Sequence, residues 1–164
     1  LYLQYLEKNM IIKLEIKPLS YNQYYKNSRT GKRIKTGAGL AYDEELGLLL
    51  GYHASALKKF GREIDLSKDI VKLEIFNYKT NFFRKDGELS KTAGDWDNPV
   101  KVLQDKIFKT MEVDDYIVKI GKVVDIPSSD LNGVIIDLNI LDIPEMQSFK
   151  ELHDVQIRSS EIRI

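Results

Sequence analysis

The sequence predicts a single α+β domain in which two main helices pack on one mixed β-sheet. The chain has 164 residues, enough for one domain with a proper core and too few for two ordinary ones. Apolar residues alternate in four segments, as in strands, and recur every three or four positions in two longer segments, as in helices. These segments follow one another in the order β-α-β-α-β-β, which favours helices packed on a sheet.

The first predicted element is a strand over residues 10–17. Pro18 ends it, because proline cannot donate the next hydrogen bond of a ladder. Residues 1–9 form an extension ahead of the domain, and residues 18–39 form a polar connection of a length typical of functional or mobile loops. One face of the strand is expected to carry Ile12, Leu14 and Ile16.

A helix is predicted over residues 40–60, followed by a second strand over residues 70–78. Gly61 suits a left-handed stop at the end of this helix. The apolar stripe of the helix comprises Tyr42, Leu46, Leu49, His53, Leu57 and Phe60. The buried face of the strand comprises Val71, Leu73 and Ile75.

The second helix is predicted to start at Asn98–Pro99, since asparagine is a favoured N-cap and proline a favoured first helical residue. Two strands follow, over residues 116–126 and 133–141, and the turn formers between them predict a hairpin. The domain thus spans residues 10–142, and residues 143–164 form a tail with a short helix and an extended segment. The buried stripe of the second helix comprises Val100, Leu103, Ile107 and Met111.

Composition narrows the classes of site and partner that the chain can have. The absence of cysteine excludes disulfides and thiolate zinc sites, and two histidines make a histidine-based zinc site unexpected. Any metal is therefore expected to be hard and oxygen-ligated, such as Mg²⁺ or Mn²⁺. No apolar run approaches the roughly 18 residues that span a bilayer, and no signal-peptide pattern opens the chain, so a cytoplasmic protein without a membrane partner is expected.

Positive charge is concentrated locally, although the chain as a whole has 25 basic and 25 acidic residues. Residues 26–35 hold five cations and no acid, and they either contact nucleic-acid phosphates or form a solvated loop. The polar loop over residues 79–94 holds adjacent phenylalanines, which either stack on unpaired bases or pack back onto the domain. The candidate nucleic-acid contacts are Lys26, Arg29, Lys32, Arg33 and Lys35, with Phe82, Phe83, Arg84 and Lys85 in the second loop.

Acidic residues flank the second predicted helix at both ends. Asp97, Lys101 and Asp105 are spaced by four residues and so share one helical face. Asp95 can converge with Asp97 if that segment is extended, and Asp114–Asp115 can return towards the flank of the helix. Clustered carboxylates need a cation or raised pKa values, and Mg²⁺ with a substrate phosphate meets that need. Alternatively, the first acids only precede and cap the helix, and the second pair is an ordinary turn.

The pattern Asp95-x-Asp97-Asn98-x-x-Lys101-x-x-x-Asp105, followed by Asp114–Asp115, resembles the signature of the RusA family of Holliday junction resolvases. The opening stretch Pro18-Leu-Ser-Tyr-Asn22-Gln-Tyr-Tyr25 and its basic loop resemble the N-terminal segment of that family, so the resemblance covers residues 10–141. It implies a cytoplasmic, bacterial or phage-encoded endonuclease of DNA recombination and repair. Such an enzyme uses Mg²⁺, with Mn²⁺ as a substitute, dimerises and cuts two strands of a four-way DNA junction.

The resemblance also implies roles for residues at matching positions. It implies that Asp95, Asp97 and Asp115 are metal ligands and that Lys101 is the catalytic lysine. Asp114 would be an auxiliary acid, and Asn98 and Asp105 would support the helix start and orient Lys101. Two other functions stay open from the sequence. One is a non-catalytic DNA-binding protein of the same fold, and the other is a nuclease that acts on flaps or replication forks.

Overall fold

The computed structural model describes residues 8–91 and 100–142, and it confirms a single α+β domain with a mixed four-stranded sheet. Helices are labelled α, strands β and the 3₁₀ helix η. In chain order the elements are β1 (Lys8–Leu14), α1 (Tyr21–Tyr24), β2 (Tyr25–Asn27), β3 (Arg33–Lys35), α2 (Gly37–Arg62), β4 (Asp69–Lys79), α3 (Val100–Met111), η2 (Asp115–Ile117), β5 (Val118–Pro127) and β6 (Gly133–Asp142). No helix in these ranges is both long and apolar enough to span a bilayer.

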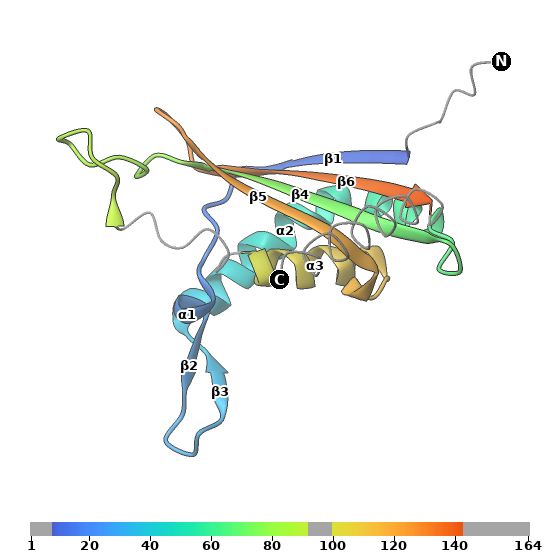
Figure 1. The fold of residues 1–164 in the computed structure, drawn as a ribbon. Coiled ribbons are helices and arrows are strands. Elements are labelled where there is room, and N and C mark those ends of the chain that lie inside the picture. The colour runs from blue at the N-terminus through green and yellow to red at the C-terminus, as the bar shows by residue number, and fades with distance from the viewer. Residues whose placement is uncertain (1–7, 92–99, 143–164) are drawn as a thin grey trace, which may run out of the picture.

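The sheet and the two long helices form two layers (Figure 1). The strand order is β1-β6-β4-β5, with β4 parallel to β5 and β6 antiparallel to both of its neighbours. Both α2 and α3 lie against the same face of the sheet, and no helix of the described residues covers the other face.

Alternation along β4 builds the core between these layers. Its inward positions Val71, Leu73 and Ile75 are at most 2 % exposed. They lie opposite Ile140, Leu138 and Ile136 of β6, in that order. The helices close the core with side chains at three- and four-residue spacing. Buried helical residues include Tyr42, Leu46, Leu50, Leu57 and Phe60 of α2, and Val102, Leu103, Ile107, Phe108 and Met111 of α3. On α2, Leu50 is buried while the predicted Leu49 and His53 are only half-buried.

The first strand is shifted from its predicted place. It runs from Lys8 to Leu14, so it includes the last two residues of the predicted N-terminal extension, and it ends before Ile16. Ile16 is nevertheless buried beside the sheet, as Ile12 and Leu14 are. Residues 1–7 and the predicted tail over residues 143–164 lie outside the described residues.

Residues 18–39, expected to be a polar connection, contain α1 and a two-stranded hairpin of β2 and β3. A capping box starts α1, because the Ser20 hydroxyl accepts from the Gln23 amide while the Gln23 side chain accepts from the Ser20 backbone. At the hairpin turn the Lys32 carbonyl accepts from the Ser28 amide, and Gly31 takes a φ of 77°, which favours glycine. Local hydrogen bonds thus build order where apolar periodicity predicts none.

The predicted hairpin between the last two strands is wrong, because β4 lies between β5 and β6. The connection from β4 through α3 to β5 is a crossover, which places two parallel strands side by side. β6 pairs with the other edge of β4 and with β1, and its residues Ile136 and Leu138 are buried. Alternation in a sequence shows which face of a strand is buried, but it does not identify the neighbouring strand.

The predicted left-handed stop at Gly61 is also wrong, because α2 continues to Arg62. Gly61 is buried where α2 meets the end of α3, and a Cβ atom there would lie 2.5 Å from the Met111 carbonyl oxygen. It would also lie 3.1 Å from a methyl carbon of Val113. The glycine is therefore explained by the close approach of two backbones and not by helix termination.

We predict that Gly61→Ala destabilises the protein by about 1–3 kcal/mol, since the new methyl group overlaps the Met111 carbonyl oxygen. Gly47 is the matched control, because it lies in the same helix, is exposed and has open space where a methyl group would be added. Gly47→Ala should stabilise by about 0.5–1 kcal/mol. Urea unfolding of both variants measures the difference, and a similar stabilisation at both positions would contradict the packing described.

Candidate functional site

Helix α3 carries two of the predicted site residues on its solvent-facing side. Lys101 and Asp105 are four residues apart and both exposed, whereas the opposite side of the helix is buried in the core. Asp95, Asp97 and Asn98 lie outside the described residues, in the segment 92–99 that joins α3 at Val100. Of the predicted site residues, the structure therefore describes those on α3 and after it, which are Lys101, Asp105, Asp114 and Asp115.

The chain reverses after α3 and brings Asp115 back to the flank of that helix. Glu112 takes a φ of 62° in the turn, and the Asp114 carboxylate caps η2 by accepting from the Tyr116 amide at 3.2 Å. The Asp115 carboxylate accepts a 3.0 Å hydrogen bond from the Gln104 side-chain amide. Asp115 is thus fixed near the first half of α3, while Asp114 is exposed and used in the cap.

The charges on this flank interact with one another. Burial raises the pKa of Asp105, the nearby Asp115 carboxylate raises it further, and Lys101 lowers it. Two carboxylates and one ammonium therefore share one electrostatic environment. Among the described residues no group of three or more acidic, histidine or cysteine side chains could hold a metal ion, so a complete oxygen-donor site would also need acids of the segment 92–99.

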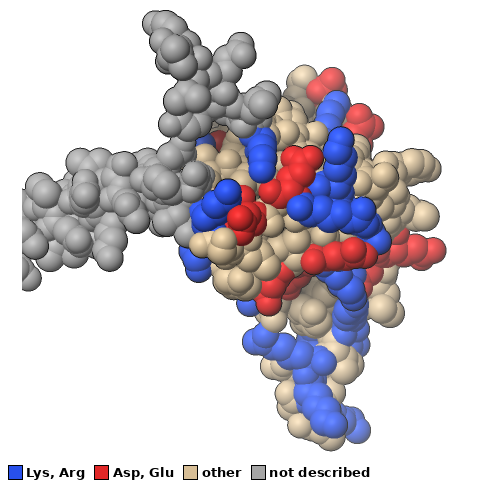
Figure 2. All heavy atoms as spheres, turned by 90° about the vertical axis from the view of Figure 1, so that its right-hand side faces the viewer, with Lys and Arg blue, Asp and Glu red and all other residues tan. Residues whose placement is uncertain are grey.

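The β2–β3 hairpin, residues 25–35, projects from the body of the domain, and we call it the basic arm (Figures 1 and 2). It holds the five basic contacts predicted within residues 26–35 and no acid. Lys26, Arg29 and Lys32 are exposed, and within the described ranges their side chains make no ion pair or hydrogen bond. These three cations are available to an anionic partner.

Arg33 and Lys35 of β3 are held by side chains of α1 and α2. The Arg33 guanidinium lies 5.1 Å from the centroid of the Tyr21 ring and donates to the Tyr21 hydroxyl. The Lys35 ammonium lies 5.5 Å from the centroid of the Tyr24 ring and donates to the Asp43 carboxylate. These two predicted contacts therefore hold the base of the arm in this structure.

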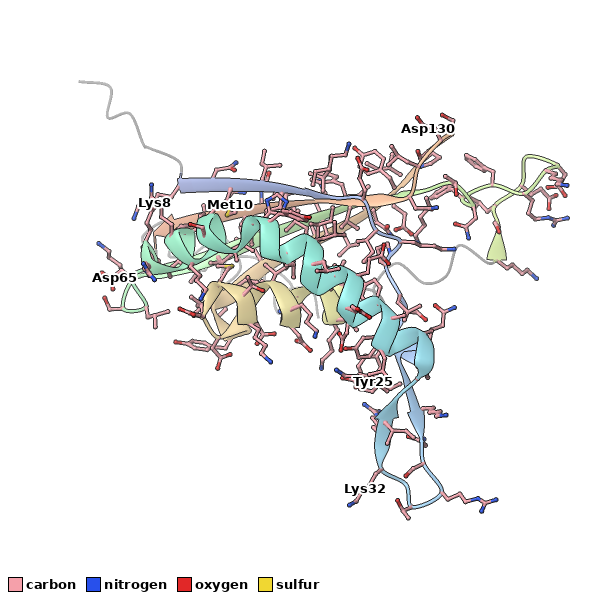
Figure 3. The ribbon with its side chains drawn as sticks, turned by 180° about the vertical axis from the view of Figure 1, so that it is seen from behind. Lys8, Met10, Tyr25, Lys32, Asp65 and Asp130 are labelled. Carbon is pink, nitrogen blue, oxygen red and sulfur yellow. The ribbon has the colours of Figure 1, made fainter. Side chains whose placement is uncertain are left out.

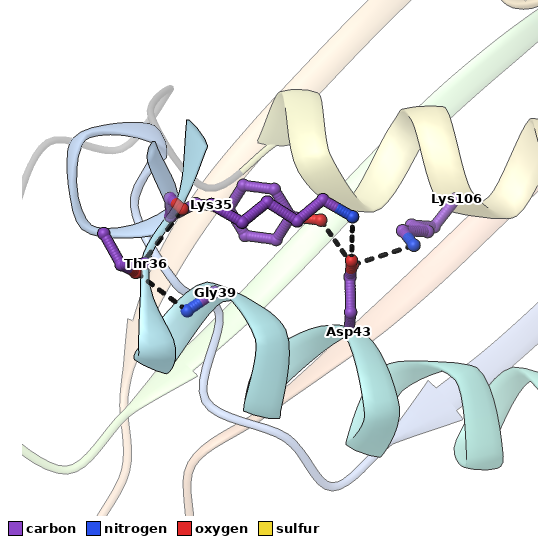
Figure 4. Close-up of polar contacts among 6 residues, drawn as sticks. Lys35, Thr36, Gly39, Asp43 and Lys106 are labelled. Carbon is purple, nitrogen blue, oxygen red and sulfur yellow. Dashed lines mark hydrogen bonds and ion pairs between the residues drawn. The ribbon is translucent and has the colours of Figure 1, made fainter. Parts of the chain in front are cut away.

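Asp43 of α2 joins the basic arm to both long helices (Figure 4). Its carboxylate accepts from the Tyr24 hydroxyl, the Lys35 ammonium and, at 2.8 Å, the Lys106 ammonium of α3. Burial raises the pKa of Asp43, but the hydrogen bonds from Lys106, Lys35 and Tyr24 outweigh it and lower the pKa to about 2. Next to it, Thr36 caps α2 by accepting from the Gly39 amide at 2.9 Å.

The second candidate loop, over residues 80–91, lies beyond the end of β4 (Figure 1). The Phe82 and Phe83 rings contact each other edge-on with centroids 5.0 Å apart, and Phe83 is 51 % exposed. Arg84 is held by its own loop, 2.6 Å from Asp86 and 3.1 Å from Glu88, whereas Lys85 is exposed. Of the four predicted contacts in this loop, Phe83 and Lys85 are exposed and are not held by an ion pair within the described residues.

Several residues of the site were not anticipated from the sequence. Gln104 gave no signal, because glutamine is ordinary on a helix surface. The Asp43 cluster gave none either, because its partners are distant in sequence. Asn77 and Lys79 did give a signal, since they continue the inward alternation of β4 with polar side chains.

Comparison with known proteins gives no family for this chain: no family model matches it, and no curated protein matches it. The resemblance to RusA resolvases therefore depends on the motif residues alone. What the chain can do chemically has to be judged from the contacts and charges described above.

We predict that Asp43→Asn lowers the pKa of Tyr24. Burial raises that pKa to about 12, the hydrogen bond and charge of Asp43 also raise it, and Lys35 lowers it. Removing the Asp43 charge should bring the pKa back towards 10.0, and Lys35→Met should move it in the opposite direction. The tyrosinate absorbance of each protein, minus that of the same protein with Tyr24→Phe, is followed as the pH rises and gives the pKa of Tyr24. Circular dichroism confirms the fold. Shifts of the same sign in both variants would contradict the arrangement in Figure 4.

Proposed function

We propose that the protein is a Mg²⁺-dependent endonuclease that cuts branched DNA, with the four-way junction as its substrate. One observation carries the proposal: the Asp115 carboxylate accepts a hydrogen bond from Gln104 of α3 and lies close enough to Asp105 to affect its pKa, as Lys101 does. The helix that bears these groups directly continues the segment with Asp95 and Asp97. A role in DNA recombination and repair follows from that substrate.

The donor chemistry of this flank fits a hard divalent cation. Asp105 and Asp115 offer carboxylate oxygens. Burial and then the Asp115 charge raise the pKa of Asp105, and Lys101 lowers it, so a further cation would be favoured here. We assign the ion to Asp95, Asp97 and Asp115, with Asp114 as a further acid close by. When bound, Mg²⁺ or Mn²⁺ polarises the scissile phosphodiester and lowers the pKa of a water molecule.

The residues of the chain have separate tasks in this proposal. The Lys101 ammonium neutralises charge that develops on the phosphate oxygens, or assists the leaving group. Gln104 keeps the Asp115 carboxylate facing α3, because its amide donates to one of the two oxygens. Asp105, one turn from Lys101, holds the ammonium towards the site through its charge.

The basic arm supplies the DNA contacts in this proposal. Its exposed cations Lys26, Arg29 and Lys32 are suited to backbone phosphates, which carry no sequence information. Phe83 and Lys85 of the second loop are a further contact, because an exposed aromatic ring can stack on an unpaired base. Paired incisions in a symmetric junction require two sites, so we propose a twofold homodimer.

A non-catalytic DNA-binding protein is the second candidate, and the basic arm favours it because the arm needs no acids to bind DNA. The acids beside Lys101 favour the nuclease, because carboxylates repel DNA unless a cation is bound. A nuclease specific for flaps or forks would use the same groups, so substrate comparison is needed to separate it from a resolvase.

We predict that Asp97→Asn reduces Mg²⁺-dependent cleavage of a four-way junction at least about 100-fold and leaves junction binding intact. Asp65→Asn, at the end of the domain away from the basic arm, is the control with the same chemical change (Figure 3). Cleavage is followed on labelled junctions and binding by gel shift in Ca²⁺. Undiminished cleavage by a folded Asp97→Asn protein would overturn the proposed site.

We predict that Arg29→Ala/Lys32→Ala weakens DNA binding and makes it less dependent on salt. Each lost phosphate contact should reduce the slope of log affinity against log salt by about 0.9, so the double variant should lose up to about 2. Lys13→Ala/Lys68→Ala removes the same charge from exposed positions elsewhere and should keep the wild-type slope. Equal slopes in the two double variants would exclude the basic arm as the DNA contact.

A further inference from the structure

The solvent-facing side of α2 is apolar along the middle of the helix. Residues 46–57 contain no Asp, Glu, Lys or Arg over about three helical turns. On the exposed side Leu48 and Tyr52, which are one turn apart, are 67 % and 87 % exposed. The exposed side of α3 carries Lys101 and Asp105 instead. Because the solvent side of a surface helix is normally polar, α2 presents a face suited to a protein partner.

Small residues adjoin Leu48 and Tyr52 on this face. Gly51 and Ser55 are exposed and lie within one turn of the two large side chains, whereas Gly47 lies farther round the helix, about 100° from Leu48. Outside its own stretch of helix, no described atom lies within 4 Å of the place where a Cβ atom of Gly51 would be. Glycine inside a helix is less favourable than alanine. A second backbone that approaches closely would account for Gly51.

Opposite charges lie at the two ends of this uncharged stretch. Glu44 and Glu45 precede it, and they are exposed. Lys59 and Arg62 follow it, and they are exposed as well. Within the described residues none of these four side chains makes an ion pair or a hydrogen bond. They suit the dipole of α2, but the dipole does not explain the apolar surface between them.

The charges select a second copy of α2 as the partner and determine its direction. If two copies of α2 run antiparallel about a twofold axis near Gly51, the acidic end of each helix meets the basic end of the other. A parallel arrangement would place Glu44 against Glu44 and Lys59 against Lys59, and like charges in contact oppose association. The face is therefore complementary to itself in the antiparallel direction only.

We propose that two copies of this chain associate through α2 as an antiparallel twofold dimer, with Leu48 and Tyr52 at the centre of the interface. These side chains of one copy pack on the small-residue surface at Gly51 and Ser55 of the other, where a large apolar side chain finds room. Helix α2 has 26 residues and is about 39 Å long, so the contact extends over several turns. The inference rests on the proposed function in one respect, the twofold homodimer, to which it assigns an interface.

Sedimentation velocity over a range of protein concentrations, without DNA or metal, tests the interface. We expect wild type to be a dimer at micromolar concentration and Leu48→Lys to weaken its dimer Kd at least about 10-fold, because the substitution enters a twofold interface twice. Ile11→Lys is the matched control, since Ile11 is 64 % exposed on β1 and should keep the wild-type Kd. A monomeric wild type, or a wild-type Kd in Leu48→Lys, would overturn the inference.

Charge reversal tests the antiparallel direction in the same assay. Glu44→Lys/Glu45→Lys makes both ends of the face basic, and Lys59→Glu/Arg62→Glu makes both ends acidic, so each variant should associate with itself more weakly than wild type. When the two variants are mixed they should form a heterodimer, because each basic end then meets an acidic end. Self-association that neither reversal weakens is the result of a parallel pairing and would overturn the antiparallel one.

Sedimentation and cleavage can fail independently. A wild type that cleaves four-way junctions in Mg²⁺ but sediments as a monomer overturns the α2 dimer and leaves the nuclease proposal standing. A wild type whose dimer is weakened by Leu48→Lys but which cuts no branched DNA supports the α2 dimer and overturns the nuclease proposal.

Discussion

The pairing of β4 with β5 is the constraint on which the rest of the structure depends. Two neighbouring parallel strands need a long connection, and here that connection contains α3. Helix α3 packs on the same face as α2. Its first residue, Val100, lies near Asn77 of β4 and Val123 of β5. This topology brings the start of α3 close to the polar residue Asn77 on the inner face of β4, although the two are far apart in the sequence.

A single carboxylate, that of Asp43, links the basic arm to α3. Asp43 is bonded to Tyr24 and Lys35 at the base of the arm and to Lys106 on α3, the helix that also carries Lys101. The direction of the arm is therefore set relative to the candidate site and not only relative to α2. For an enzyme that must place one scissile phosphate in a branched substrate, a fixed angle between the DNA contacts and the site reduces the ordering required on binding.

The sequence predicts the elements better than their arrangement. Alternation in β4 and helical spacing in α3 identify both elements, because burial of one face determines those patterns. The sequence did not predict that β6 lies between β1 and β4, because alternation does not identify a neighbouring strand. It also did not predict α1 or the hairpin of the basic arm, because short capped elements leave little periodicity. At the candidate site, Lys101 and Asp105 share a helical face by spacing alone. The Gln104–Asp115 and Asp43 contacts join side chains that only the fold brings together, and the roles implied by the RusA resemblance remain predictions.

The central claim is that acids around α3 make this protein a cation-dependent nuclease for branched DNA. The most direct measurement compares the cleavage of labelled four-way junction, flap and duplex substrates side by side, with and without Mg²⁺. We expect paired incisions in the junction only when Mg²⁺ is present, and little cutting of duplex. Binding of all three substrates without cleavage in Mg²⁺ or Mn²⁺ would contradict the account and favour a non-catalytic DNA-binding protein.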